Sequence, residues 1–463
     1  MGIRLDWEIE ADHDTFNGLG EHPLAVQQRR ANYRRALLAV ILVAGVVLAV
    51  AGAVAGRLWY VDHVIEEQLR ETVAAEVAAL RIGDIAAYLN VQRSGSGAWL
   101  LGQTDLFWAY QQLKLDREVE LTGNVLALTI EDNRGRVAVE EIIDGERYQV
   151  LWFYWRYEDG WRHVPMDVTF WGGDSVYEGQ NLTVSYGALD EALVEALVPG
   201  LERLWNGGCR WLACVTALPP LTVRVLPDPA VGVTWSPDEP DTLRIASPLA
   251  GRRARLDVPL EPELAHEIGT LLAERIIDHA WGGLNPVPQT DADFLYGAVR
   301  DWLVGRFLAD GGAPGSTFVQ SLVAAYGESA PGTLVAALQP ASTVAVLSEA
   351  FATPLDALPV DWREFFQWRL ALEPFLIAQG NQDALLALYD DRAQHEASVL
   401  LGDPGAASRP APTVLRVVVG AGSDGESRAW AVVQYPDGSE GVITFRLVDG
   451  VWLRSVPDAA FPG

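Results

Sequence analysis

The amino-acid sequence predicts an α+β protein of several domains that is anchored by a single N-terminal transmembrane helix. Three observations carry this prediction. An apolar run of 21 residues lies near the N-terminus, helical and strand periodicities alternate after it, and a hairpin motif near residue 160 returns at the C-terminus. A chain of 463 residues with 49% hydrophobic side chains is long enough for about two to four domains.

The charge balance limits the kinds of partner. The sequence has 62 acidic and 34 basic residues, which gives a net charge of −28. Such a charge repels phosphate backbones, so no nucleic-acid partner is expected. The two cysteines, Cys209 and Cys214, allow one local disulfide in an oxidising compartment or two buried thiols, and the sequence leaves both interpretations open.

The first 56 residues predict a tail and a membrane span. Residues 1–35 are polar and of mixed charge, which is typical of a short, mostly unstructured tail. Residues 36–56 form the apolar run, long enough as a helix to cross a hydrocarbon core of about 30 Å. Four arginines precede the run, and Arg57 and then acidic residues follow it. By the positive-inside rule, the N-terminus is cytoplasmic and the bulk of the chain is extracytoplasmic at the cell membrane.

Two features of this segment allow other interpretations. A cleaved signal peptide is the rival to a permanent anchor, but the preceding tail is long and the run exceeds the usual length of about 7–15 residues. Gly45, Ala49, Gly52 and Gly56 form a stripe of small residues. Such a stripe predicts a homodimer through the transmembrane helix, or it belongs to an Ala/Gly-rich anchor with no partner helix.

Residues 64–172 predict a first α+β domain. An amphipathic helix is expected over residues 64–89, and the Ser-Gly-Ser-Gly stretch at 94–97 ends the helical pattern. Alternating residues then predict antiparallel strands over 119–130, 136–143 and 148–157. The last hairpin contains Asp159-Gly160-Trp161 at its turn.

The C-terminal residues 366–463 repeat this pattern. Residues 444–457 show the same order of Arg, Asp-Gly, Trp, Arg and Val-Pro as residues 156–165. The helical pattern at 370–391 is similar to that at 67–89, and strands are expected over 414–419 and 429–435. An internal repeat of this length predicts a duplicated domain.

The helix–strand order and the Asp-Gly-x-Trp hairpin resemble the nuclear-transport-factor-2-like, or cystatin-like cone, family. The resemblance implies a helix packed against a concave sheet in both copies. Enzymes of that family use an Asp or a His inside the cone, but neither copy here offers an Asp–His or Tyr–Asp set for this role. His163 and His395 lie at non-equivalent positions, so each is expected to be a structural or surface histidine.

Residues 176–365 predict a mainly helical middle domain with a small sheet. Strands are expected over 182–185, 221–226 and 242–246, and a helix over 189–205. Longer helices are expected over 263–278 and 292–309, followed by short helices over 318–326, 333–338 and 344–351.

The helix at 263–278 carries a His266-Glu267 pair in an apolar run. In H-E-x-x-H helices, two histidines bind zinc and the glutamate activates the bound water. The order of elements and this half-motif resemble the gluzincin, or peptidase MA-like, metallopeptidases. The resemblance implies that His266 is a zinc ligand, Glu267 the general base and Asp301 the third ligand. Thr270 occupies the position of the second ligand, which makes the motif incomplete.

These patterns lead to one main functional hypothesis and two alternatives. The main one is a membrane-anchored, extracytoplasmic binding or scaffolding protein for an unknown protein or peptide ligand, with a catalytically degenerate metallopeptidase-like core and no cofactor. The alternative is a zinc-dependent peptidase that uses His266, Glu267 and Asp301. A weaker third hypothesis is chemistry inside a cone domain, which a pocket lined by a His or Asp pair would favour.

Overall fold

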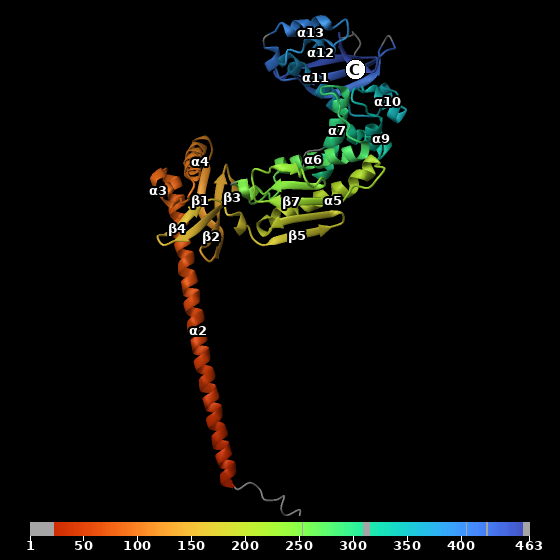
Figure 1. The fold of residues 1–463 in the computed structure, drawn as a ribbon. Coiled ribbons are helices and arrows are strands. Elements are labelled where there is room, and N and C mark those ends of the chain that lie inside the picture. Colours follow the sequence, from red (N-terminus) through yellow and green to blue (C-terminus); the bar gives the residue numbers. More distant parts are fainter. Residues whose placement is uncertain (1–22, 252, 309–314, 404, 423–424, 457–463) are drawn as a thin grey trace, which may run out of the picture. The chain divides into compact units, whose positions relative to one another are not determined.

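The computed structural model describes residues 23–251, 253–308, 315–403, 405–422 and 425–456 (Figure 1). Helices make up about half of the described residues, and the described strands form three sheets. The mixed helix and sheet content expected from the sequence is therefore confirmed. The helices are α2 (Pro23–Ile82), α3 (Ile85–Val91), α4 (Gly97–Asp116), α5 (Glu191–Leu212), α6 (Pro262–Trp281), α7 (Asp291–Phe307), α8 (Thr317–Tyr326), α9 (Ala330–Ala337), α10 (Ala345–Phe351), α11 (Arg363–Ala378), α12 (Gln382–Leu386) and α13 (Gln394–Leu401).

The described strands belong to three sheets, and β10 returns to the first sheet after the strands of the second. The first sheet has the order β1-β2-β3-β10, with β4 also paired with β3. The second has the order β5-β6-β7-β9-β8, and the third β11-β12-β13-β14. The strands are β1 (Val119–Glu131), β2 (Arg134–Ile143), β3 (Glu146–Tyr157), β4 (Gly160–Val164), β5 (Asp174–Gly179), β6 (Leu182–Gly187), β7 (Leu221–Leu226), β8 (Val233–Trp235), β9 (Thr242–Ala246), β10 (Ala254–Arg255), β11 (Thr413–Ala421), β12 (Ser427–Gln434), β13 (Glu440–Val448) and β14 (Val451–Ser455).

Contacts between residues divide the chain into two compact units. Unit 1 contains the chain up to Leu113 together with residues 128–135 and 154–164. Unit 2 contains residues 114–127, 136–153 and 165–463. The division passes through β1, β2 and β3, so part of the first predicted α+β domain belongs to each unit.

Unit 1 is built on α2, a helix of 60 residues (Figure 1). The part from Asn32 to Ile82 contains a stretch long and apolar enough to cross a membrane, and none of that stretch is buried inside the protein. The helix begins at Pro23, so residues 23–35 are helical rather than unstructured as expected. Pro is favourable at a helix start, and the Ala, Gln and Arg that follow are good helix formers. The rest of the expected tail, residues 1–22, lies outside the described residues.

The helix expected over 64–89 is the end of α2 followed by α3. Gly83 has a φ of 78°, a value that glycine adopts easily, and it ends α2. Asp84 then begins α3, because its side chain accepts a hydrogen bond from the Ala87 amide at 3.0 Å. The buried face of α2 includes Leu69, Val73 and Val77, which are at most 2% exposed. This face anchors α2 in the core of unit 1.

The central sheet of unit 2 combines parallel and antiparallel strands. β6, β7 and β9 are parallel to one another, and the outer strands β5 and β8 pair with them in antiparallel fashion. The strands expected over 221–226 and 242–246 have those bounds in β7 and β9. Leu197, Leu201 and Leu204 of α5 are fully buried in the hydrophobic core beside this sheet.

The third sheet is an antiparallel meander that shares its core with α11. The rings of Phe366 on α11 and Phe445 on β13 have centroids 4.5 Å apart, and Phe366 also lies 5.8 Å from Trp452 on β14. All three belong to the same hydrophobic core as α5, α6 and α7. The middle and C-terminal segments of unit 2 are therefore packed continuously.

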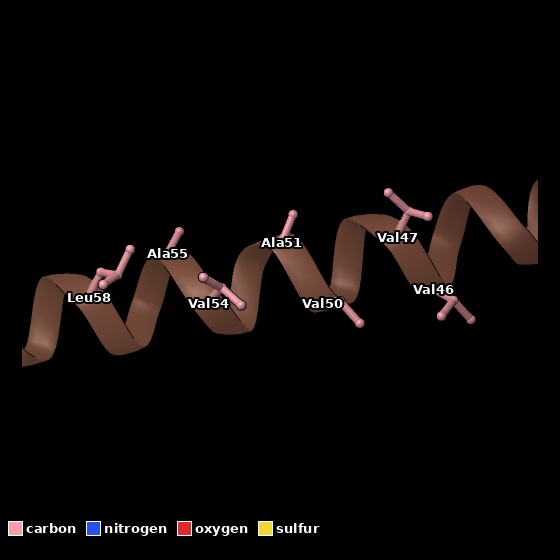
Figure 2. Close-up of a pocket in the computed structure, with 7 residues that line it drawn as sticks. All are labelled: Val46, Val47, Val50, Ala51, Val54, Ala55 and Leu58. Carbon is pink, nitrogen blue, oxygen red and sulfur yellow. The ribbon is translucent and has the colours of Figure 1, made fainter.

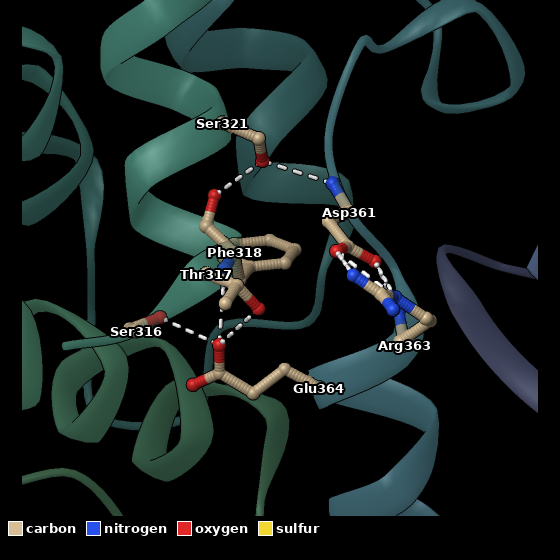
Figure 3. A network of polar contacts seen from close by, with 7 residues as sticks. All are labelled: Ser316, Thr317, Phe318, Ser321, Asp361, Arg363 and Glu364. Atoms are coloured by element: carbon tan, nitrogen blue, oxygen red, sulfur yellow. Dashed lines mark hydrogen bonds and ion pairs between the residues drawn. The ribbon is translucent and has the colours of Figure 1, made fainter. Parts of the chain in front are cut away.

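A polar network fastens α8 to α11 (Figure 3). The Glu364 carboxylate accepts hydrogen bonds from the Ser316 hydroxyl at 2.9 Å, the Thr317 hydroxyl at 3.2 Å and the Phe318 amide at 3.0 Å. It thus satisfies donors at the start of α8, where amides lack partners within the helix. Beside it, Ser321 accepts a hydrogen bond from the Asp361 amide at 2.9 Å.

Strand β10 was not expected from the sequence. It pairs with β3 through Ala254 and Arg255. The neighbouring Arg253 forms an ion pair with Glu141, a residue of β2 that is 2% exposed. Two residues are too few for an alternating pattern, so only the pairing in the folded chain defines this strand.

Candidate functional site

The most distinctive polar site in unit 1 surrounds Glu76, a fully buried residue of α2. Its Oε1 accepts a hydrogen bond from Nε2 of Gln92 at 2.7 Å and lies 2.7 Å from Nδ1 of His163. Its Oε2 accepts a hydrogen bond from the Tyr154 hydroxyl at 2.8 Å. Gln92 and Tyr154 thus donate to this carboxylate, and His163 Nδ1 donates as well when it carries a proton. Glu76, Gln92, Tyr154 and His163 are called the Glu76 centre below.

Four elements assemble the Glu76 centre. Glu76 comes from the helix that begins at Pro23, and Gln92 follows the end of α3. Tyr154 comes from β3 and His163 from β4, and an isolated parallel β-bridge joins Gln92 to His163. The amide of the next residue, Arg93, donates to the His163 carbonyl at 2.8 Å. Backbone and side-chain contacts therefore hold the same four segments together.

Aromatic rings surround the centre, and its side chains are almost inaccessible to solvent. The Trp99 ring lies edge-on to the His163 ring, with centroids 5.8 Å apart, and the Tyr154 ring lies 5.1 Å from it. Gln92 and His163 are each 7% exposed, and Tyr154 is fully buried. Gln92 Oε1 and Trp99 Nε1 are buried and have no hydrogen-bond partner among the described residues. The centre therefore includes two buried polar atoms that its hydrogen bonds do not satisfy.

Burial sets the protonation of Tyr154. Its removal from water, and then the negative charge of Glu76, raise the pKa of the phenol well above its ordinary value. Tyr154 therefore remains a hydrogen-bond donor to Glu76 at any pH at which the protein is folded. The centre thus brings a buried carboxylate and an imidazole into contact beside a phenol that keeps its proton.

Unit 2 contains a second centre of the same kind. Arg454 on β14 places Nη1 2.7 Å from Oε2 of Glu373 on α11, and the same Nη1 lies 3.2 Å from the Tyr389 hydroxyl. Burial disfavours the charge on Arg454, but Glu373 outweighs this effect and raises the pKa of the guanidinium. Burial and Glu373 also raise the pKa of Tyr389. Glu373, Tyr389 and Arg454 are called the Glu373 centre below.

The two centres correspond in sequence and in backbone contacts. Gln92 lies sixteen positions after Glu76, and Tyr389 lies sixteen positions after Glu373. The isolated bridge between Gln92 and His163 has its counterpart between Tyr389 and Arg454. The Arg93 amide donates to the His163 carbonyl at 2.8 Å, and the Asp390 amide donates to the Arg454 carbonyl at 2.9 Å.

The residues predicted as a zinc site lie on α6 and α7 of unit 2. His266 and Glu267 are exposed on the first half of α6, and Asp301 is half-buried on α7. Thr270 donates its hydroxyl hydrogen bond to the His266 carbonyl at 2.8 Å, a bond within the helix. The threonine that replaces the second ligand is thus engaged with the backbone of its own helix.

The packing of α6 against α7 determines where along the two helices each predicted ligand lies. A Cβ on Gly269 would lie 3.1 Å from the Phe307 ring and 3.3 Å from Val304. Further along α6, Glu274 lies 3.5 Å from Arg300, the residue before Asp301. The two helices are therefore antiparallel. In this register Asp301 lies near Glu274, about 10 Å from His266 along the axis of α6. The structure therefore does not bring His266 and Asp301 together.

Asp301 instead belongs to a charged face shared by α6 and α7. Arg300 lies 3.0 Å from Asp301 and also pairs with Glu274. Burial, followed by the charges of Asp278 and Glu274, raises the pKa of the nearby Tyr296 to about 12. Among the described residues, no group of three or more His, Cys, Asp or Glu side chains is arranged to hold a metal ion.

No family model matches the chain. No curated protein and no solved structure matches it either. The resemblances to cone-type domains and to gluzincins therefore remain predictions, and the geometry above is the basis for functional argument.

The cysteines form one disulfide, which resolves the alternatives that the sequence left open. Cys209 lies near the end of α5, and Cys214 follows that helix. Ala213 between them adopts a left-handed conformation with a φ of 53°, which ends the helix. The disulfide thus closes the turn at the C-terminus of α5.

An apolar hollow runs along one helix and is a different kind of surface. Figure 2 shows its seven lining side chains, all of them on α2 and all apolar. They are Val46, Val47, Val50, Ala51, Val54, Ala55 and Leu58. A surface made by one apolar helix suits lipid chains, and the hollow lies within the candidate membrane span.

Sequence reasoning missed the Glu76 centre. It expected His163 to be a structural or surface histidine and did not consider Glu76. The usable signal was the repeat itself, since Glu76 and Glu373 lie at equal distances before Gln92 and Tyr389. An acid at the same place in both copies, within an otherwise apolar face, indicates a buried partner.

Proposed function

We propose that the chain is a single-pass membrane protein whose extracytoplasmic part binds or scaffolds a protein or peptide partner. The observation that carries the non-enzymatic side of this proposal is the register of α6 and α7, which separates His266 from Asp301. A catalytic zinc site needs about three protein ligands around one metal. The middle segment would then keep the architecture of a metallopeptidase without its metal chemistry.

The orientation across the membrane rests on two observations. Arg34 and Arg35 immediately precede the apolar run, which favours a cytoplasmic N-terminus. The disulfide between Cys209 and Cys214 lies on the other side of the run, and disulfides persist in oxidising compartments. Both observations favour an extracytoplasmic location for residues 57–463.

Site-specific labelling in intact cells tests this orientation. In a background with both native cysteines replaced by alanine, Ser96→Cys and Gln27→Cys each introduce one exposed thiol. We expect a membrane-impermeant maleimide to label Ser96→Cys in intact cells and Gln27→Cys only after permeabilisation. The opposite pattern would overturn the orientation. Labelling of neither variant in intact cells would place the whole chain inside the cell and overturn it as well.

We further propose that residues 64–172 and 366–463 are duplicated domains. The equal spacing before the two β-bridges and the matching backbone hydrogen bonds support this proposal. In both copies an acid on the first helix meets a basic residue on the last strand. A shared hydrophobic pattern does not by itself require an acid and a basic residue to pair at these positions. The pairing is therefore independent support for a common origin.

Exposed apolar residues on α4 offer one surface for a partner. Leu101 and Trp108 are 69% and 58% exposed and lie seven residues apart, on one face of the helix. The opposite face, with Gln103 and Phe107, is buried in unit 1. Large apolar side chains presented together on a helix are typical of protein interaction sites.

Metal analysis separates this proposal from the zinc-peptidase alternative. We expect the purified full-length protein to bind much less than one zinc per chain, and His266→Ala to change nothing. The matched control is His395→Ala, which removes an exposed histidine on α13. About one zinc per chain, lost in His266→Ala and kept in His395→Ala, would replace the scaffold proposal with the enzyme.

A further inference from the structure

His163 and Arg454 occupy corresponding positions but differ in one chemical property. Each is the basic partner of an acid at 2.7 Å, and each bridges to the segment after the second helix. A guanidinium keeps its charge at every pH at which proteins fold, whereas an imidazole changes charge between about pH 5 and pH 8. The basic partner in the Glu373 centre is therefore a group of fixed charge, whereas the basic partner in the Glu76 centre is an imidazole.

The groups around His163 determine the effect of a change in its charge. The ring contacts Glu76 of α2, Tyr154 of β3 and the Trp99 ring of α4, and the backbone of Gln92 at the end of α3 bridges to that of His163. Among these neighbours the charge that faces the ring is that of Glu76. The guanidinium of Arg93 is directed to Asp159 at 3.0 Å, and Tyr88 donates its hydroxyl to Gln103 at 2.6 Å.

A neutral ring leaves Glu76 in an unfavourable environment. Glu76 is fully buried, and a buried carboxylate without a counter-charge is strongly destabilising. The hydrogen bonds from Gln92 and Tyr154 remain, but neither donor carries a charge. The contact between α2 and β4 is therefore strongest when His163 is protonated.

We propose that the Glu76 centre is a pH-sensitive latch that fastens β4 and the end of α3 to α2 when His163 is protonated and loosens them when it is not. The Glu373 centre is the corresponding latch in a permanently closed form. Because α2 also contains the apolar run, the latch acts on the helix that would cross the membrane. The proposal does not depend on which side of the membrane unit 1 occupies.

Hydrogen–deuterium exchange of the full-length protein in detergent micelles tests the latch, with the second centre as an internal reference. Exchange is compared at about pH 6 and about pH 8 after correction for the intrinsic rate of each amide. We expect protection around Arg93 and His163 to fall about tenfold or more at the higher pH. Protection around Asp390 and Arg454 should stay constant, because their backbone bond lies beside a charge that does not titrate.

Two variants strengthen the comparison. His163→Arg copies the residue of the second centre and should abolish the pH dependence. Glu76→Gln removes the buried charge, so a neutral ring no longer leaves it uncompensated, and the fall in protection should also disappear. Equal changes around the two centres in the wild-type protein would overturn the proposal. A folded variant of either kind that keeps the full fall in protection would overturn it too.

Discussion

Arg454 places Nη1 2.7 Å from Oε2 of Glu373, and the side chains of the two residues are only 21% and 12% exposed. The pair joins β14 to α11, and it also contacts Tyr389. Removal of Glu373 is costly because Arg454, in a poorly solvated place, is left with the more distant carboxylate of Glu396 at 4.0 Å.

We therefore expect Glu373→Gln to lower the free energy of unfolding of unit 2 by about 2–4 kcal/mol. Chemical denaturation followed by tryptophan fluorescence measures this quantity. The control is Glu239→Gln, which breaks a pair with Arg224 whose side chains are 47% and 45% exposed. Solvent screens that pair, so its loss should cost at most about 1 kcal/mol. Equal losses in the two variants would contradict the assigned difference in burial.

Asp190 predicts a pH dependence of the stability of unit 2. Its carboxylate is 1% exposed, accepts a hydrogen bond from the Trp171 indole at 2.7 Å, and contacts the Ser247 hydroxyl. Burial raises the pKa of Asp190, and the two hydrogen bonds only partly oppose this effect. The folded state therefore binds the proton more tightly than the unfolded chain.

With that sign, the contribution of Asp190 to stability is greatest below about pH 4 and is lost as the pH rises through the raised folded-state pKa. We expect Asp190→Asn to remove this part of the pH dependence, which appears as a difference between urea midpoints measured across the acidic range. Asp190→Ala should instead destabilise at all pH values by about 1–3 kcal/mol, because it leaves the Trp171 N–H unpaired. A wild-type curve parallel to that of Asp190→Asn would contradict the assignment.

Two helical glycines provide a matched test of the packing of unit 2. A Cβ on Gly332 in α9 would lie 2.6 Å from the carbonyl carbon of Leu212, a backbone atom that cannot move aside alone. A Cβ on Gly297 in α7 would meet nothing within 4 Å. We expect Gly332→Ala to cost about 1–3 kcal/mol or more, and Gly297→Ala to stabilise by up to about 1 kcal/mol. Similar effects of the two substitutions on the thermal midpoint would show that α9 and α5 are not in this close contact.

The disulfide should make a modest contribution, because it closes a loop of few residues. Its cysteines are five positions apart, and the loss of such a short loop is expected to cost about 2 kcal/mol. Non-reducing mass spectrometry should find Cys209 and Cys214 in one linked peptide, and thiol reagents should react only after reduction. Reaction of both cysteines in the native, unreduced protein would contradict the disulfide and weaken the proposed extracytoplasmic location.

Elements with strong periodicity were predictable from the sequence, and those defined by distant contacts were not. The alternation at 221–226 and the Pro262 at the start of α6 predicted their elements correctly. Strand β10 escaped prediction because its two residues are extended only through pairing with β3. The Glu76 centre escaped because its partners lie up to 87 positions away, and local patterns carry no information on such contacts.

The predicted zinc site shows that a local motif also does not reveal how two helices pack. The His266-Glu267 pair is recognisable within five residues, yet its relation to Asp301 depends on how two helices are packed. Because Gly269 has no Cβ, α6 can approach Val304 and Phe307 closely. This contact determines which residues of α7 lie beside which residues of α6. Spacing along the chain does not reveal that register.

The continuity of α2 has a mechanical consequence. From Gly56, at the end of the apolar run, to Ile82 the helix extends for about 39 Å without a break. If the apolar run spans a membrane as proposed, the helix would act as a lever arm whose pivot is the bilayer. A change in tilt of about 10°, well within the range that transmembrane helices adopt, would sweep the Ile82 end sideways by about 7 Å. Bilayer thickness would thus be converted directly into a displacement of unit 1.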